Sequence, residues 1–142
     1  MDIKKEYERW LANATADADV AAELKTLDDA KIEDAFYRDL DFGTGGLRGV
    51  IGAGTNRMNI YTVAKASQGL ADYLKKNFAE PSVAIGYDSR IKSDVFAKSR
   101  CWCFCSQWGQ GEYLACSDAG AYRVLCDPLS AYLCGCHGHR FP

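Results

Sequence analysis

The chain has 142 residues, of which 48% are hydrophobic and 25% charged, and its formal net charge at pH 7 is −2. This length suits one domain with a modest hydrophobic core. The weak net charge gives no indication of a nucleic-acid or membrane partner. We expect no signal peptide and no membrane-spanning segment, and therefore a cytoplasmic chain.

Residues 1–38 are expected to form an N-terminal helical extension. Apolar residues recur at helical spacing over residues 2–13 and 15–25, and Asp28 or Asp29 is placed to begin a third helix. Acidic residues near a helix start are favourable because that pole of the helix is positive. The expected buried positions are Ile3, Tyr7, Trp10, Leu11, Ile32 and Phe36. We expect this extension to pack on a domain rather than to act on a substrate.

The stretch from residue 39 to residue 59 is rich in glycine and is the first candidate site. Six glycines surround Thr44 and Arg48. Glycine lets the backbone approach a ligand closely, successive backbone N–H groups can form an anion-binding concavity, and arginine presents a fork of donors suited to phosphate. The pattern indicates a phosphate-binding loop, with a tight hairpin and an ordinary surface arginine as the equally weighted alternative. We expect a strand over residues 47–51 and a turn over residues 52–56.

Beyond this stretch, the pattern alternates between helix and strand. Asn59 is expected to cap a helix over residues 60–78, and residues 82–87 form a short apolar strand. The apolar face expected for this helix comprises Val63, Ala66, Leu70, Tyr73 and Leu74. Ser93 is expected to cap a further helix. This order of elements indicates an α/β layered domain.

Asp88 and Arg90 follow the second expected strand at its C-terminal end. Ligands of α/β sheets commonly lie beyond this end of the strands, so both side chains are candidate ligand contacts. A structural pair in which Asp88 and Arg90 stabilise the turn is an explanation of at least equal weight.

Two blocks of the sequence resemble one enzyme family. Residues 42–49 read Phe-Gly-Thr-Gly-Gly-Leu-Arg-Gly, residues 56–59 read Asn-Arg-Met-Asn, and residues 83–90 read Val-Ala-Ile-Gly-Tyr-Asp-Ser-Arg. In this order and at about this spacing they are similar to the N-terminal part of the α-D-phosphohexomutases, of the phosphoglucomutase and phosphomannomutase type. The resemblance extends to about Lys98. It implies a truncated first domain of a layered α/β fold over residues 39–98.

The resemblance also implies a sugar-phosphate chemistry. Enzymes of this family interconvert hexose 1-phosphates and hexose 6-phosphates through a phosphoserine, with a Mg²⁺ held by an Asp-x-Asp-x-Asp loop. By the match, the catalytic-loop residue is Arg48. The phosphate-binding residues that the match implies are Thr44, Gly45, Gly46, Arg48, Asp88 and Arg90.

The family's nucleophile and metal loop have no counterpart in these residues. The sequence contains neither a Thr-Ala-Ser-His-Asn-Pro serine loop nor an Asp-x-Asp-x-Asp run. Loss of a nucleophile costs many orders of magnitude in rate. We therefore expect a catalytically incompetent chain that binds no metal, although Mg²⁺ and a hexose phosphate are what the whole family implies.

Composition changes abruptly after Arg100. All seven cysteines and both histidines lie beyond this residue, and no lysine follows Lys98. A zinc or redox-active tail is one interpretation, because Cys and His are zinc ligands, but the Cys-x-Cys spacing does not match the usual two-residue knuckle. The apolar residues of the tail show no clear period, so we expect residues 99–142 to be poorly ordered. An exposed sheet edge then favours aggregation, and the sequence leaves the oligomeric state open.

The thiols at the start of the tail are expected to be exposed. They belong to Cys101, Cys103 and Cys105. Such thiols oxidise readily if their surroundings lower their pKa.

A change of reading frame explains the tail more completely. Codons can be assigned from Lys98 onward so that removing one adenine yields a string resembling the family's continuation as far as its serine loop. We therefore hypothesise that residues 99–142 are read out of frame. Two alternatives stay open: a non-catalytic phosphate-binding module that uses residues 43–54, and a small zinc or redox protein that uses the tail.

The out-of-frame hypothesis makes a prediction about the DNA. We expect a run of adenines at the Lys98 codon, followed in the neighbouring frame by codons for the serine and metal loops. Sequencing the gene through this codon and well beyond it is the measurement. Codons for residues 99–142 that are incompatible with such a frame would contradict the hypothesis.

Overall fold

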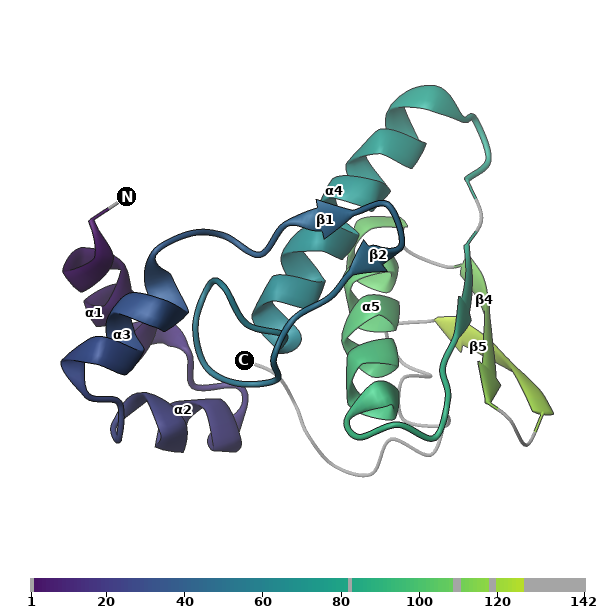
Figure 1. Cartoon of the computed structure of the whole chain (residues 1–142). Helices are drawn as coiled ribbons and strands as arrows, with labels where there is room; N and C mark the ends of the chain where they lie inside the picture. Colours follow the sequence, from purple (N-terminus) through teal and green to yellow (C-terminus); the bar gives the residue numbers. More distant parts are fainter. Residues whose placement is uncertain (1, 82, 109–110, 118–119, 127–142) are drawn as a thin grey trace. The chain divides into compact units, whose positions relative to one another are not determined.

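The computed structural model describes residues 2–81, 83–108, 111–117 and 120–126 (Figure 1). The chain divides into two compact units, the first ending at Thr62 and the second beginning at Val63, and each is described by itself. The mixture of helices and small sheets confirms the expected α/β class. Across the described ranges, every helix is too short or too polar to traverse a bilayer.

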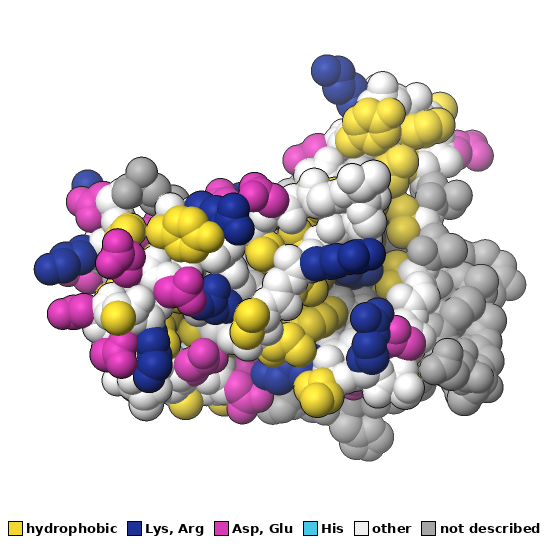
Figure 2. Space-filling view, in the orientation of Figure 1, with side chains coloured by type: hydrophobic (Ala, Val, Ile, Leu, Met, Phe, Trp, Pro, Cys, Tyr) yellow, Lys and Arg dark blue, Asp and Glu magenta, His cyan; other side chains and the backbone are white. Residues whose placement is uncertain are grey.

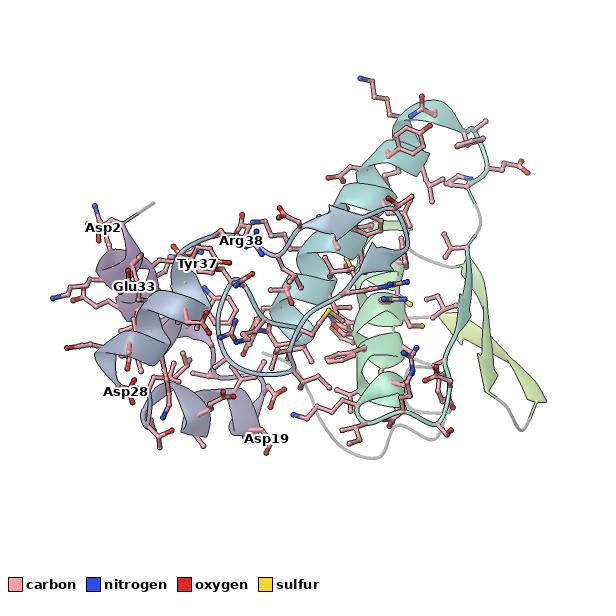
Figure 3. The ribbon with its side chains drawn as sticks, in the orientation of Figure 1. Asp2, Asp19, Asp28, Glu33, Tyr37 and Arg38 are labelled. Atoms are coloured by element: carbon pink, nitrogen blue, oxygen red, sulfur yellow. The ribbon has the colours of Figure 1, made fainter. Side chains whose placement is uncertain are left out.

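Three short helices open the first unit, as the sequence predicts. They are α1 (Ile3–Asn13), α2 (Ala18–Leu24) and α3 (Asp29–Phe36). Each begins after an aspartate whose carboxylate accepts backbone N–H bonds of the first turn: Asp2 from Lys5, Asp17 from Asp19 and Val20, and Asp28 from Lys31. Figure 3 shows Asp2 and Asp28 at the starts of α1 and α3. These caps explain why such short helices begin where they do.

Phe36 is the centre of the core that these helices enclose, and it is fully buried. Tyr7 and Trp10 of α1 meet its ring edge-on, each with a centroid distance of 5.7 Å. Ile32 packs against the same core, as expected. Leu11 does not: it is 41% exposed, because it lies one residue and about 100° around the helix from Trp10.

The glycine-rich stretch forms a short hairpin instead of the strand expected over residues 47–51. Strands β1 (Phe42–Gly43) and β2 (Gly46–Leu47) pair antiparallel, with Phe42 opposite Leu47. Ile51 makes only an isolated bridge with Met58. Regular pairing ends at Leu47, and beyond it Val50 O and Gly52 N both bond to the backbone of one residue, Met58, so residues 47–51 do not form the expected strand.

Asn59 caps the long helix α4 (Ile60–Asn77), which confirms the expected start of this helix. Its Oδ1 accepts from the backbone N–H groups of Tyr61 (3.1 Å) and Thr62 (3.0 Å). The buried face of α4 differs from the expected one, since Leu70 and Tyr73 are 46% and 59% exposed. The positions buried along α4 are Ile60, Val63, Ser67 and Ala71. Burial of Ser67 is tolerated because its hydroxyl donates to Val63 O at 2.8 Å.

A three-stranded sheet and two helices build the second unit. After α4 come β3 (Ala84–Gly86), α5 (Ser93–Trp108), β4 (Gly111–Ser117) and β5 (Gly120–Cys126). β3 pairs parallel to β4, which pairs antiparallel to β5. A parallel pair needs a long connection, which α5 provides. The core between these elements contains Ala71, Ile85, Ala97 and Phe104.

Helix α5 continues through Lys98, where the composition changes. Ala97 and Phe104 are buried, and Cys101 and Cys105 pack against the same core. These positions follow the i, i+4, i+7, i+8 spacing of one helix face, so the expectation that the tail shows no period is wrong for its first residues. Residues 127–142 lie outside the described ranges, and the order of the tail as a whole stays a prediction.

Replacing Gly54 or Gly69 by alanine should change the free energy of unfolding in opposite directions. At Gly54 φ is +130°, and an added Cβ would lie 2.6 Å from Ala35 O, so we expect Gly54→Ala to lower the free energy of unfolding by roughly 2–4 kcal/mol. Gly69, inside α4, has no atom within 4 Å of an added Cβ, so Gly69→Ala should raise it by about 0.5–1 kcal/mol. Urea unfolding of both variants is the measurement. Equal changes in the free energy of unfolding for the two variants would show that the backbone at Gly54 is not packed against Ala35 as described.

Candidate functional site

The predicted phosphate-binding residues of the first unit all lie in the β1–β2 hairpin or directly after it. Thr44 and Gly45 form its turn, and Gly46 leaves the turn with φ +99°, a left-handed conformation that favours glycine. Arg48 follows β2 and is exposed. The structure therefore brings Thr44, Gly45, Gly46 and Arg48 together on one small, glycine-lined hairpin.

The Arg48 side chain folds back over the turn. A Cβ built on Gly45 would lie 2.5 Å from Arg48 Nη2 and 3.0 Å from Cζ. The absence of a side chain at Gly45 is thus what leaves room for the guanidinium. Within the part of the chain that the structure describes, Arg48 takes part in no hydrogen bond or ion pair. Its five N–H donors are available to an anion in solution.

The hairpin is carried by backbone bonds on both sides. Before β1, Leu40 N donates to Thr55 O at 2.9 Å. After β2, Met58 N donates to Val50 O at 2.8 Å and Gly52 N donates to Met58 O at 3.1 Å. These bonds fix where the hairpin leaves the first unit and where it returns.

Asp88 and Arg90 lie in the second unit, in the turn that follows β3. Arg90 donates to the Asp88 carboxylate twice, from its backbone N at 3.2 Å and from Nε at 2.7 Å. These bonds hold the pKa of Asp88 below its ordinary value, and the bond from the Arg90 backbone contributes more than the bond from its guanidinium. This is the structural pair that the sequence offered as an alternative. Contact of either residue with a ligand stays a prediction.

Ser93 has a different role from the one expected. Helix α5 begins at Ser93, but the hydroxyl accepts from Asp88 N at 3.2 Å instead of capping the helix. Lys92, directly before it, has φ 61°, and its carbonyl accepts the first helical bond, from Phe96 N at 3.0 Å. The serine therefore ties the start of α5 to the Asp88 turn.

The cysteines at the start of the tail lie on α5. No group of three or more His, Cys, Asp or Glu side chains that could hold a metal ion occurs among the described residues. Cys101 Sγ and Cys105 Sγ lie 3.9 Å apart, one helical turn from each other. Cys103 is buried, which corrects the expectation of an exposed thiol, and burial raises the pKa of its thiol.

The zinc interpretation also involves cysteines and histidines near the end of the tail. Cys134, Cys136, His137 and His139 lie outside the described ranges. The zinc interpretation therefore stays a prediction.

Three residues that support the hairpin were not singled out from the sequence as site residues. Glu23 binds Ala53, and Asp34 binds Arg57, within the segment that carries the hairpin. Arg57 lies inside the block at residues 56–59 that carries the family resemblance, and this block was the only available signal. Glu23 and Asp34 belong to an extension with many acidic residues, where nothing in the local sequence distinguishes them. Figure 2 shows Asp and Glu side chains gathered on the side of the molecule that this extension forms.

Comparison with known proteins points to one enzyme family. Residues 39–107 match the family model described as phosphoglucomutase/phosphomannomutase, alpha/beta/alpha domain I. The matched range ends within α5 and so extends past Lys98. No solved structure matches the chain.

Named relatives point the same way. The chain is 42% identical to a probable phosphoribomutase of Schizosaccharomyces pombe over 68% of its own length, and 34% identical to the phosphoribomutase of Saccharomyces cerevisiae over 80%. It is 45% identical to a phosphoglucomutase of Staphylococcus haemolyticus over 46%. The chain spans 17%, 19% and 12% of the lengths of these three relatives, respectively. Together with the domain match, these similarities show that the chain carries an N-terminal segment of the phosphohexomutase family.

Proposed function

We propose that the Arg48 hairpin binds the phosphoryl group of a phosphorylated sugar in the family's mutase reaction. The observation that carries this proposal is the position of the Arg48 guanidinium, exposed over Gly45 and without a partner in the described residues. A guanidinium that already served a fold-stabilising ion pair would have to give up that pair before binding a ligand. Arg48 carries no such cost.

The chemistry of the hairpin suits a phosphoryl group. Arginine can donate two parallel N–H bonds to phosphate oxygens, and charge-assisted bonds of this kind are about twice as strong as neutral ones. During phosphoryl transfer, negative charge spreads over the equatorial oxygens, and a cation preset beside them stabilises that charge. The exposed hydroxyl of Thr44 stands at the same turn and adds a further donor.

The sugar is proposed only at the level of class. The relatives are named for glucose and for ribose, so a hexose phosphate and a pentose phosphate are both candidates. The hairpin recognises the phosphoryl group and not the sugar ring, because its donors are a guanidinium, a hydroxyl and backbone N–H groups. We therefore propose that choice between sugars rests on residues outside the hairpin.

For the 142 residues by themselves, we propose that the chain binds a sugar phosphate but does not convert it. They contain no Thr-Ala-Ser-His-Asn-Pro loop to supply a nucleophile. The described residues also offer no group of three metal-binding side chains, so they do not fit the family's Mg²⁺. We therefore assign no phosphoryl-transfer step to the 142-residue chain. The reaction is a property proposed for a complete family protein, to which this segment contributes the arginine hairpin.

Paired glycine variants test the hairpin as an anion site. Gly45→Ala places a methyl group against the Arg48 guanidinium, which can swing away, so we expect weaker binding of glucose 1-phosphate by roughly tenfold with almost unchanged stability. Gly43→Ala meets only Gly46 O at 3.6 Å, an ordinary contact, and is the matched control with unchanged affinity. Calorimetric titration with glucose 1-phosphate and with ribose 1-phosphate measures both.

Arg48→Lys adds a second comparison at the same site. Lysine keeps the charge but loses the planar fork, so its affinity should fall between those of wild type and Arg48→Ala. Equal affinities for Gly45→Ala and Gly43→Ala would refute the proposed site, as would unchanged binding by Arg48→Ala.

The purified 142-residue chain should not interconvert sugar phosphates. The physical reason is the missing nucleophile, which typically costs many orders of magnitude in rate. A coupled assay with glucose 1-phosphate and ribose 1-phosphate is the measurement, with a full-length phosphoglucomutase as the positive control. Turnover that scales with the concentration of the chain and disappears in Arg48→Ala would disprove the prediction.

A further inference from the structure

The segment from residue 52 to residue 59 carries both sides of the Arg48 hairpin. Thr55 accepts the Leu40 N–H before the hairpin, and Met58 exchanges backbone bonds with Val50 and Gly52 after it. The Thr55 hydroxyl also donates to Arg38 O at 2.7 Å. Movement of this segment would therefore move both ends of the hairpin together.

Helix α3 binds this segment through its last turn. Asn56 N donates to Ala35 O at 2.9 Å, and Arg57 Nη1 donates to Asp34 O at 3.4 Å. These are carbonyls that a helix end leaves without helical partners. The Asp34 carboxylate also pairs with Arg57 Nη2, and the Arg57 side chain is only 17% exposed. Figure 3 shows Tyr37 and Arg38 where the chain leaves α3 on its way to β1.

Helix α2 binds the same segment from another direction. Ala53 N donates to Glu23 Oε2 at 3.0 Å, and a Cβ built on Gly52 would lie 2.9 Å from Glu23 Oε1. Ala53 is 1% exposed, so its N–H group has little access to water. Without the Glu23 carboxylate this donor would be left unsatisfied, which is costly for a buried group.

We propose that Glu23 and Asp34 are positioning residues of the Arg48 hairpin, which gives the helical extension a part in the phosphate site. This inference rests on the proposed function of the hairpin. Neither carboxylate is suited to contact the ligand, since a phosphate would be repelled and both groups are already bonded to the 52–59 segment. Their effect on Arg48 passes through Thr55 and Met58.

Hydrogen exchange at single amides tests the proposal without any ligand. We expect Glu23→Ala and Asp34→Ala to accelerate exchange at the Leu40 and Met58 amides by about tenfold, the effect of losing roughly one hydrogen bond. The Tyr37 amide donates to Glu33 O at 2.9 Å at the end of α3, and its exchange should stay within about twofold of wild type. Glu23→Gln retains an oxygen acceptor for Ala53 N and should restore wild-type exchange.

Lys31→Ala is the matched control on the same helix. It removes an exposed ion pair with Asp28 and touches nothing in the 52–59 segment, so all three amides should exchange as in wild type. Acceleration at Tyr37 equal to that at Leu40 and Met58 would indicate a general loss of stability and overturn the proposal. Unchanged exchange at Leu40 and Met58 would also overturn it.

Titration of the same variants with glucose 1-phosphate separates the two proposals. If both hold, Glu23→Ala and Asp34→Ala weaken binding by about three- to tenfold, in step with the exchange at Leu40 and Met58. If the wild-type chain does not bind glucose 1-phosphate, the proposed function fails, and the exchange rates alone still decide whether Glu23 and Asp34 position the hairpin. Unchanged affinity beside faster exchange would overturn their role in the phosphate site.

Discussion

The side-chain amide of Asn59 is the interaction on which the first unit most depends. It is 2% exposed, and its nitrogen donates to Gly52 O at 2.8 Å and to Gly54 O at 2.9 Å while its oxygen accepts the first N–H groups of α4. One buried group therefore closes the glycine-rich corner and starts the next helix. Aspartate would keep the oxygen but lose the donor, and an apolar residue would leave buried carbonyls and helix N–H groups without partners.

The distribution of charge partners suits an arginine that has no ion-pair partner among the described residues of a unit rich in carboxylates. Asp34 is engaged with Arg57, and Glu23 with the Ala53 backbone. Each of these acids is thus bonded within its own unit. Other partners for the acids of the same unit favour an open hairpin, because an opposite charge within a few ångströms would compete with the ligand.

The starts of the helices could be predicted from the sequence because their signals are local. Asp2, Asp17, Asp28 and Asn59 each accept bonds from residues at most three positions away, so the chain order alone contains the information. The residues of the hairpin were recognisable for the same reason. The role of Glu23 was not, since the residue it binds is thirty positions further along.

Other errors arose where packing or backbone bonding decides. Helix α4 buries the face that contains Val63, Ser67 and Ala71. Leu70 and Tyr73 stay exposed although they are more apolar than Ser67. The expected strand at residues 47–51 is wrong because the pairing ends at Leu47 and the backbone around Ile51 bonds to the single residue Met58. The helical face that continues past Lys98 includes Cys101 and Cys105, and cysteine packs in cores as a small hydrophobic residue although its pattern in a sequence also indicates metal or redox chemistry.

The parallel pairing of β3 with β4 has a consequence for how the chain is made. Ile85 pairs with Ala115, thirty residues later, whereas every bond that carries the hairpin closes before Thr62. At about 5–20 residues per second, a ribosome needs roughly 1.5–6 s to add those thirty residues. During that interval the partner strand of β3 has not been made, while every residue whose backbone bonds carry the hairpin already exists. Synthesis from the N-terminus therefore lets the arginine hairpin fold before the sheet that follows it exists.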